Sequence, residues 1–412
     1  MHIIMTNSLG FIRRIVVPYN RSNLIALWIA SLLAAGAWQQ VAPFLPGYLT
    51  ELGAGQNLHA WSAITFSIHY ISAFVFLPFW GSWGDRVGNK RLMVQAGFCL
   101  ALLYGALCLA TNPVQVVIIR LVSGAMTGFI PGGLALVAAN APRELAGKHV
   151  AALQTAGAAG MVFGPISGGV LADWFGYKGA LLATAIMLLC ATLLVIFGVH
   201  EDRIPQHKIG QQQERLVQML RQPAFAASML LMCLYAVATL SVQPILTLYL
   251  ESLNTMQVNW TRGVFLCLPG LALMLTSTLW ERQITRYRAA IILIPSTILA
   301  GVAALSIGFS SNIVLFAIAY FGLGVCAAGM RSGAATMVVK HMNKDSYGRA
   351  YTLQQWALMF GGFTGPLLAG TVGELAGTHA AFIFCGILLV LGAILLRRLL
   401  SPLGLNPVKK AA

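Results

Sequence analysis

The feature that most constrains this chain is a succession of long apolar stretches separated by short polar ones. Each reaches the roughly 20 residues that an α-helix needs to cross a bilayer core. Only 9% of the 412 residues are charged, against about 25% in a soluble domain. The first stretch is too long for a cleaved signal peptide, and no A-x-A-like site follows it. We predict an all-α membrane protein with twelve spans, near residues 23–49, 60–80, 92–111, 113–139, 149–173, 178–199, 224–250, 260–280, 289–309, 312–339, 349–373 and 379–400.

The basic residues lie almost entirely in alternate loops. Of the 26 Lys and Arg residues, only Lys178 and Arg262 fall on one side of the spans, and Arg120 and Arg331 fall inside them. Because loops rich in Lys and Arg stay in the cytoplasm, we predict an inner (plasma) membrane protein with cytoplasmic N- and C-termini. The net charge of +15 then reflects topology, so we expect contact with lipid and no nucleic-acid partner.

A polar stretch divides the spans six and six. It predicts an N-terminal bundle over 1–199, a cytoplasmic linker over 200–222 and a C-terminal bundle over 223–412. A shift of 201 residues aligns VAPFLPGYLTEL (41–52) with VQPILTLYLESL (242–253), and also the small residues of 156–172 with those of 357–373. Because each half has an even number of spans, the copies are parallel repeats about an axis along the membrane normal. We expect a central path between two pseudo-symmetric bundles.

The most specific motif is GSWGDRVGNKR (81–91), which fills the short loop between the second and third spans. Glycines permit a sharp turn and close backbone approach, and an acid there can bind a helix N-terminus or an arginine. The loop resembles the signature G-x-x-x-D-R-x-G-R-[KR] of the major facilitator superfamily, with Asn89 at a usually basic position. The resemblance implies the major facilitator fold and a cytoplasmic gate at Gly81, Gly84, Asp85, Arg86, Gly88, Lys90 and Arg91.

A second motif, GAAGMVFGPISGG (157–169), lies in the fifth span and resembles the signature of the drug:proton antiporters of that superfamily, the branch of tetracycline and multidrug efflux. Small residues at four-residue spacing let helices approach closely, and a proline removes one backbone hydrogen bond and favours a kink. Tight packing and a hinge role both remain open, and the resemblance favours export. The residues concerned are Gly160, Gly164, Pro165, Gly168 and Gly169.

Two ionisable side chains inside the first-half spans are candidates for coupling or substrate binding. Arg120 matches an arginine that the family carries in its fourth span, and a guanidinium inside a membrane is costly unless it faces a cavity or a partner. The alternative is a structural charge bound to backbone carbonyls. His69 lies in the middle of the second span and can take a proton near physiological pH, although a lone histidine is also a common packing residue.

The remaining candidates are polar or aromatic residues of the other spans. All eleven acidic residues lie at helix ends or in loops, so a buried carboxylate that would attract cations is missing. Arg331, if it faces inward with Arg120, gives the cavity a positive potential, which favours neutral, zwitterionic or anionic substrates. Uncharged amides within a membrane need internal partners, either a substrate or a neighbouring helix. The amides and the aromatic residue that we include are Gln39, Gln40, Gln243, Gln355 and Trp356.

Several functions are excluded or disfavoured. No G-x-x-x-x-G-K-[ST] phosphate loop occurs and the seven cysteines form no C-x-x-C pair, so we expect no enzyme activity, cofactor or metal. The leading hypothesis is a monomeric secondary transporter that exports small lipophilic drugs in exchange for protons by alternating access. The alternative is a dedicated carrier of one metabolite, such as an organic acid or a siderophore. A receptor or scaffold is disfavoured because no additional domain is available to signal.

Overall fold

Every regular element that the computed structural model describes is helical, in keeping with the apolar stretches of the sequence. The described residues are 21–140, 146–201, 222–252, 258–287, 289–310, 312–342 and 347–401. Most of the predicted linker, 202–221, lies outside them. The elements are α2 (Arg21–Gln40), α3 (Leu45–Glu51), the 3-10 turn η1 (Gly55–Asn57), α4 (Leu58–Val87), α5 (Asn89–Leu107), α6 (Pro113–Ala125), α7 (Phe129–Asn140), α8 (Ala146–Gly198), α10 (Pro223–Leu240), α11 (Val242–Ser252), α12 (Asn259–Arg286), α13 (Ala289–Gly308), α14 (Ile313–His341), α15 (Tyr347–Ala376) and α16 (Thr378–Leu400).

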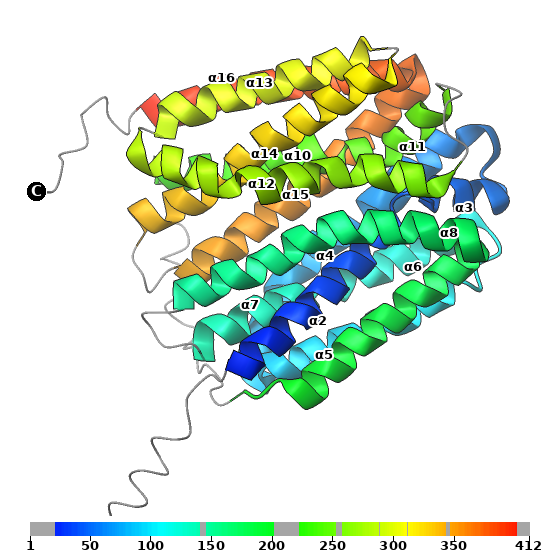
Figure 1. The fold of residues 1–412 in the computed structure, drawn as a ribbon, viewed down its shortest axis with the longest axis horizontal. Helices are drawn as coiled ribbons and strands as arrows, with labels where there is room; N and C mark the ends of the chain where they lie inside the picture. Colours follow the sequence, from blue (N-terminus) through cyan, green and yellow to red (C-terminus); the bar gives the residue numbers. More distant parts are fainter. Residues whose placement is uncertain are drawn as a thin grey trace, which may run out of the picture.

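The described helices cross the molecule twelve times, as predicted. Among the described residues, ten helical segments are long and apolar enough to span a membrane. One of them, within α8, is two spans, because Gly176 has a φ of 71° and the chain folds back there (Figure 1). The 30-residue helix α15 supplies the twelfth crossing, and its helical run continues past Pro366. Three crossings are each formed by two consecutive helices with a break between them, namely α2 with α3, α6 with α7 and α10 with α11.

The internal repeat of the sequence reappears as two bundles, α2 to α8 and α10 to α16. Gly377, which separates α15 from α16, has a φ of 87° and corresponds to Gly176 in the repeat. The starts of α4 at Leu58 and of α12 at Asn259 are separated by the same interval. A positive φ suits glycine because it has no Cβ, so the repeat preserves the reversal of direction as well as the helix positions.

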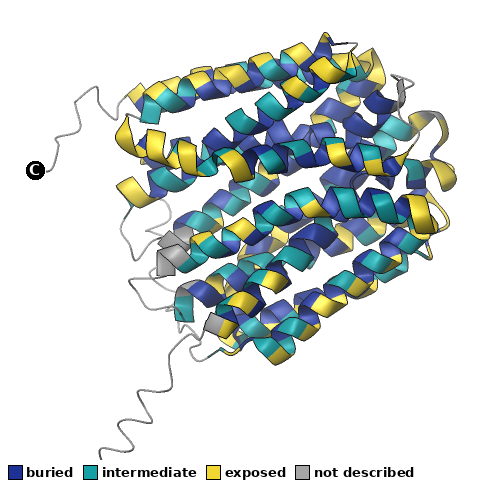
Figure 2. Cartoon of the chain, viewed as in Figure 1, coloured by how far each residue is buried: buried dark blue, intermediate teal, exposed yellow. Residues whose placement is uncertain are grey.

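The outer surface of the bundles is apolar, as contact with lipid requires. Figure 2 shows the most exposed residues on the outward faces of the helices and the buried ones between them. Large hydrophobic side chains are strongly exposed there, including Leu102 at 74% and Phe197 at 78%. In water so much exposed apolar surface would drive association, whereas in a bilayer it faces acyl chains.

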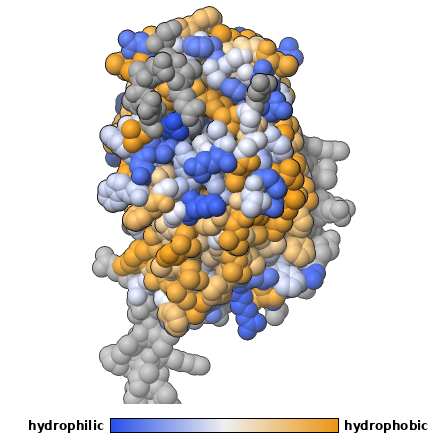
Figure 3. Space-filling model, turned by 90° about the vertical axis from the view of Figure 1, so that its right-hand side faces the viewer, coloured by the Kyte–Doolittle hydropathy of each residue, from blue (hydrophilic) through white to orange (hydrophobic). Residues whose placement is uncertain are grey.

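The start of α2 and the end of α16 lie at the same end of the molecule, at the left of Figure 1. We call this end the terminal face and the opposite end the far face. Figure 3 looks onto the far face, where hydrophilic side chains gather above a hydrophobic flank. The bundles meet along two pairs of helices, α8 with α12 and α4 with α15, and these two seams flank the centre of the molecule.

Backbones approach closely along both seams in the half nearer the far face. A Cβ on Gly169 of α8 would lie 2.6 Å from the Cα of Trp260 in α12. On the other seam, a Cβ on Gly370 of α15 would collide with the side chain of Ala63 in α4. Gly169 and Gly370 are equivalent positions of the two halves, so the repeat places a glycine at the same point of each seam.

Candidate functional site

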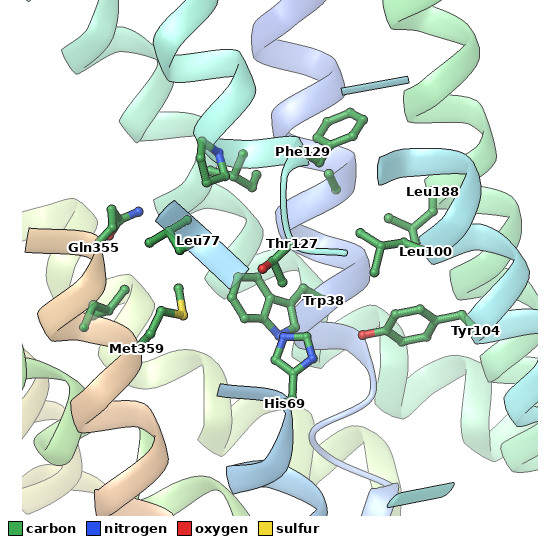
Figure 4. A pocket seen from close by; sticks show the side chains of 14 residues that line it. Trp38, His69, Leu77, Leu100, Tyr104, Thr127, Phe129, Leu188, Gln355 and Met359 are labelled. Atoms are coloured by element: carbon green, nitrogen blue, oxygen red, sulfur yellow. The ribbon is translucent and has the colours of Figure 1, made fainter. Parts of the chain in front are cut away.

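A cavity lies where the first bundle meets α15 (Figure 4). Its volume is about 80 Å³, which is room for several water molecules, since one needs about 10–15 Å³ by this measure. Six crossings contribute to its wall. The lining residues are Ala34, Trp38, His69, Leu77, Leu100, Tyr104, Thr127, Phe129, Ile130, Pro131, Leu188, Gln355, Leu358 and Met359.

The wall of the cavity is mainly apolar and aromatic, with a few polar groups. No Lys, Arg, Asp or Glu is among the lining residues. Polar contacts come from the imidazole of His69, the hydroxyls of Tyr104 and Thr127 and the amide of Gln355. In Figure 4 Trp38 and His69 lie one above the other, and the Tyr104 hydroxyl points towards them. Such a wall suits an uncharged or weakly polar lipophilic molecule with a small number of hydrogen-bonding groups.

The hydrogen bonds around His69 determine which of its ring nitrogens carries the proton. The hydroxyl of Ser123 donates to the carbonyl oxygen of Arg120 over 2.9 Å. Its single proton is thereby used, so it can only accept at the 3.1 Å contact with His69 Nδ1. Neutral His69 therefore carries its proton on Nδ1, and the lone pair lies on Nε2.

This Nε2 lone pair is buried and unused. The His69 side chain is 2% exposed, and Nε2 has no hydrogen-bond partner among the described residues. The ring contacts Trp38, with 5.2 Å between ring centroids, and Tyr70, with 5.5 Å. A buried acceptor without a partner is costly, so this nitrogen is available either to a proton or to a hydrogen-bond donor on a ligand.

Arg120 lies behind the cavity wall and not in it. Its guanidinium donates to the Tyr104 hydroxyl over 3.1 Å and lies 6.0 Å from the centre of the Phe66 ring. Its side chain is 3% exposed. No carboxylate in the described part of the chain lies within salt-bridge distance of it, and its Nε has no hydrogen-bond partner there. Tyr104 thus connects a buried positive charge to the cavity.

Arg331 is likewise absent from the cavity lining. Its guanidinium donates to the Tyr235 hydroxyl over 3.3 Å and lies 5.5 Å from the centre of the same ring. The Tyr235 hydroxyl in turn contacts Met161 Sδ across the bundles at 3.8 Å. The sequence-based condition that both arginines face into one cavity is therefore not met by this cavity.

The amides and the tryptophan occupy different places. Gln355 lines the cavity. Gln40 is buried and accepts from Thr184 over 3.0 Å within its own bundle. Gln243 donates to Gln39 across the bundles over 3.4 Å.

Trp356 also bridges the bundles, and it does so beside the cavity and not within its lining. Its indole donates to the carbonyl of Phe74 over 2.7 Å. The two rings stack with centroids 4.4 Å apart.

The glycine motif of α8 packs on two neighbours. A Cβ on Gly160 would lie 2.8 Å from the backbone nitrogen of Gly36, and Cβ atoms on Gly164 and Gly168 would collide with carbonyl oxygens of α2. Gly169 instead faces α12. Helical backbone angles continue through Pro165, and the break in α8 is at Gly176.

The loop of residues 81–91 is a helix-to-helix turn at the terminal face. Gly88 has a φ of 95° and ends α4. The carboxylate of Glu201 caps the start of the next helix, α5. It accepts from the backbone amides of Asn89 over 2.8 Å and Lys90 over 3.0 Å. The ammonium of Lys90 donates to the carbonyl of Ile196 over 2.9 Å. The side chain of Asp85 lies outside the described part of the structure.

Several groups around the cavity had no sequence signal of their own. Tyr104, Thr127, Phe129 and Met359 are residue types that ordinarily pack helices, and only the tertiary arrangement brings them together. Within the described residues, no group of three or more His, Cys, Asp or Glu side chains is arranged to hold a metal ion.

Comparison with known proteins identifies the architecture. The chain matches the Major Facilitator Superfamily over residues 27–276 and again over 244–411. It is 31% identical over 373 residues to the multidrug resistance protein MdtG of Salmonella paratyphi A, which covers 89% of this chain and 92% of the relative. The MdtG of Salmonella typhi matches to the same extent.

Solved structures share the fold at low sequence identity. A bacterial homologue of the human lysosomal transporter Spinster, inward-facing and occupied, superposes with a TM-score of 0.75 at 12% identity, covering 95% of this chain and 99% of that one. The human organic anion transporter MFSD10 gives 0.69 at 18% identity, covering 91% and 99%. With a family match that extends over both bundles and a relative of 31% identity along most of its length, the chain belongs to the Major Facilitator Superfamily of membrane transporters.

Proposed function

We propose that this chain exports small lipophilic compounds from the cytoplasm in exchange for protons, as a monomer in the inner membrane. The observation that carries the proposal is the cavity, which combines an apolar and aromatic wall with one imidazole, that of His69. The multidrug resistance proteins to which the chain is 31% identical support the export of drugs, as does the resemblance of residues 157–169 to the antiporter signature.

The composition of the cavity wall supports a broad range of ligands. Aromatic and aliphatic surfaces bind by area and shape, so they accept chemically unrelated molecules of similar size. A wall without a carboxylate has no strong preference for cations. The substrates that fit are therefore neutral or weakly acidic, with at most a few hydrogen-bonding groups to meet Gln355, Thr127 or His69.

His69 is the group that we assign to the proton. Its Nδ1–H is held by Ser123, so an incoming proton goes to Nε2 of a side chain that lines the cavity. Proton and substrate then compete for one cavity, which is the requirement for exchange.

Alternating access supplies the transport step. With the terminal face in the cytoplasm, as the basic loops predict, the bundles are packed together on the periplasmic side of the cavity. Rocking of one bundle against the other opens that side and closes the cytoplasmic side, where the glycine-rich loop of residues 81–91 lies. The packing of Gly169 on α12 and of Gly370 on α4 makes the far-side contact a large one that must part as a unit.

A dedicated carrier of one organic acid is less well supported by the geometry. Such a carrier needs a fixed cation in its binding site to pair with the carboxylate. Arg120 and Arg331 are both held by tyrosine hydroxyls and neither lines the cavity. A panel of unrelated toxic compounds separates the two functions, because a dedicated carrier changes resistance to few of them.

The test of proton coupling is transport by reconstituted protein under an imposed pH gradient. His69→Asn keeps an N–H for Ser123 but cannot titrate, so we expect gradient-driven export of a lipophilic dye to fall about a hundredfold or more, on the scale of a lost proton-transfer group. Binding of the dye, measured by fluorescence without a gradient, should persist.

The matched control is His379→Asn. His379 lies in α16 and contacts the carbonyl of Gly308 at 2.9 Å, away from the cavity, so its replacement should leave gradient-driven export intact. Arg120→Ala should reduce dye binding, because Tyr104 loses its partner. Full gradient-driven transport by His69→Asn would exclude this histidine as the coupling group.

A further inference from the structure

An acidic residue of the first bundle binds the start of a helix in the second. Asp173 follows the glycine motif of α8, and its Oδ1 accepts from the backbone amide of Asn259 over 2.9 Å and from the Asn259 side chain over 2.8 Å. Its Oδ2 accepts from the amide of Trp260 over 2.8 Å. These are the first two amides of α12, which have no partner within the helix. The carboxylate thus caps α12 from across the bundle interface.

The other seam has an acid at the corresponding place. Glu374, near the end of α15, lies with its Oε2 3.8 Å from Nδ1 of His59, the second residue of α4. The imidazole also packs on Gly373, where a Cβ would lie 3.6 Å from the ring. The side chains of His59 and Glu374 are only 29% and 33% exposed. This contact also joins the two bundles at the far face.

The internal repeat relates these two contacts. Asp173 and Glu374 are equivalent positions of the two halves, and so are the residues that they meet, since Asn259 corresponds to Leu58 and Trp260 to His59. Each acid follows the small-residue run of its own helix, and each meets the first turn of a helix in the opposite bundle. The symmetry of the fold therefore places one acid on each seam, at matching positions about the central axis.

We propose that Asp173 and Glu374 are a repeated pair of positioning residues that hold the far face closed while the terminal face is open. Each bond exists only when its seam is closed, because donor and acceptor belong to different bundles. Breaking both is part of every opening of the far face. The pair thus sets how often the far side of the cavity is exposed, whatever the substrate is.

The two contacts differ in kind. The Asp173 contact consists of three short hydrogen bonds to groups that are always donors. The Glu374 contact is an ion pair only while His59 is protonated. We therefore expect Asp173 to contribute more to closure than Glu374, and we expect a permanent cation at position 59 to strengthen the weaker contact.

The test measures, without any substrate, access to the contact between α11 and the first bundle. Thr247 of α11 is fully buried, and its hydroxyl donates to the carbonyl of Pro43 over 3.5 Å, so Thr247→Cys reports on opening there. A membrane-impermeant maleimide is added to right-side-out and to inside-out vesicles, in a background with Cys108→Ser. Lys178→Cys lies at the far face and serves as the reference. The vesicle type in which it is labelled is the one in which labelling of Thr247→Cys is measured, so no orientation in the membrane has to be assumed.

We expect the double variant Asp173→Ala, Glu374→Gln to raise the labelling rate of the reporter about fivefold or more, which is the scale of one lost helix cap. Asp173→Ala alone should have most of the effect. His59→Arg should act in the opposite direction and slow labelling, which a merely damaged protein would not do. The matched control is Glu51→Gln, since Glu51 is an exposed acid at the far end of α3.

Loss of structure is distinguished by Cys385, which is 3% exposed in the core of the second bundle and should stay unlabelled in every variant. A double variant that labels at the wild-type rate with Cys385 protected would overturn the proposal, as would faster labelling of His59→Arg. Because the assay involves neither drug nor proton gradient, a failure of the proposed function leaves this result unaffected, and the reverse also holds.

Discussion

At the scale of single residues, the glycines of α8 are required by distance. A Cβ on Gly168 would collide with the carbonyl oxygen of Gln40, and one on Gly164 with that of Gly36. Both obstacles are backbone atoms, which cannot rotate away. Gly157, at the start of the same motif, has no atom within 4 Å of its added Cβ. The motif is therefore a mixture of positions that need glycine and one that does not.

This difference gives a matched pair of variants. Gly168→Ala should destabilise the protein by about 1–3 kcal/mol, because overpacking forces α2 to move. Gly157→Ala should be neutral or stabilising by up to about 1 kcal/mol, because alanine favours the helix. Thermal unfolding in detergent measures both. Equal loss in the two variants would show that the motif acts through something other than its contact with α2.

At the scale of elements, the N-termini of two helices are capped by acidic side chains from distant parts of the chain. Glu201 caps α5 within the first bundle, and Asp173 caps α12 between the bundles. A carboxylate there satisfies amides that have no partner in the helix and also interacts favourably with the helix dipole. Gly88 belongs to the same arrangement, because a Cβ there would lie 2.7 Å from Glu201 Oε2.

Replacing the cap of α5 should have a local effect. Glu201→Ala should cost about 1–2 kcal/mol of stability, the usual range for a lost cap. Hydrogen exchange of the first amides of α5 should accelerate before the rest of that helix is affected. Glu281→Ala, at an exposed position near the end of α12, is the control and should leave exchange in α5 unchanged. Unaltered exchange in Glu201→Ala would contradict the capping role.

At the scale of the whole molecule, two copies of one bundle enclose a cavity and meet along two seams. The prediction that the chain is not an enzyme is confirmed, because the family to which it belongs consists of transporters. The hydrophobic core is continuous across the two bundles, so part of it must separate during transport. The paired acids join the same two bundles at the far face.

The orientation in the membrane is testable directly. With the terminal face in the cytoplasm, Lys178→Cys should react with an impermeant maleimide on intact cells. Ser82→Cys, exposed in the loop of residues 81–91, should react only after the cells are permeabilised. The reverse labelling pattern would show that the terminal face lies outside the cytoplasm. The proposed directions of drug and proton movement would then be reversed.

The sequence by itself determined the fold, because long apolar runs, the distribution of basic residues and the internal repeat each constrain helices one at a time. It also named His69 and Gln355, which line the cavity, together with Arg120, which lies behind the wall. The repeat in the sequence also aligns Asp173 with Glu374. The sequence does not indicate that each acid contacts the opposite bundle.

Only the tertiary structure decided which side chains meet. Trp38, Tyr104 and Met359 come from three different helices, and periodicity along one helix carries no information about its neighbours. Periodicity also gave no information about the partner of Arg331. The sequence places this residue in a span, and the structure shows that it donates to Tyr235 and does not line the cavity. Helix formation depends on local hydrogen bonds and on partition into lipid, whereas a site depends on packing between helices, and packing is settled only when all of them are in place.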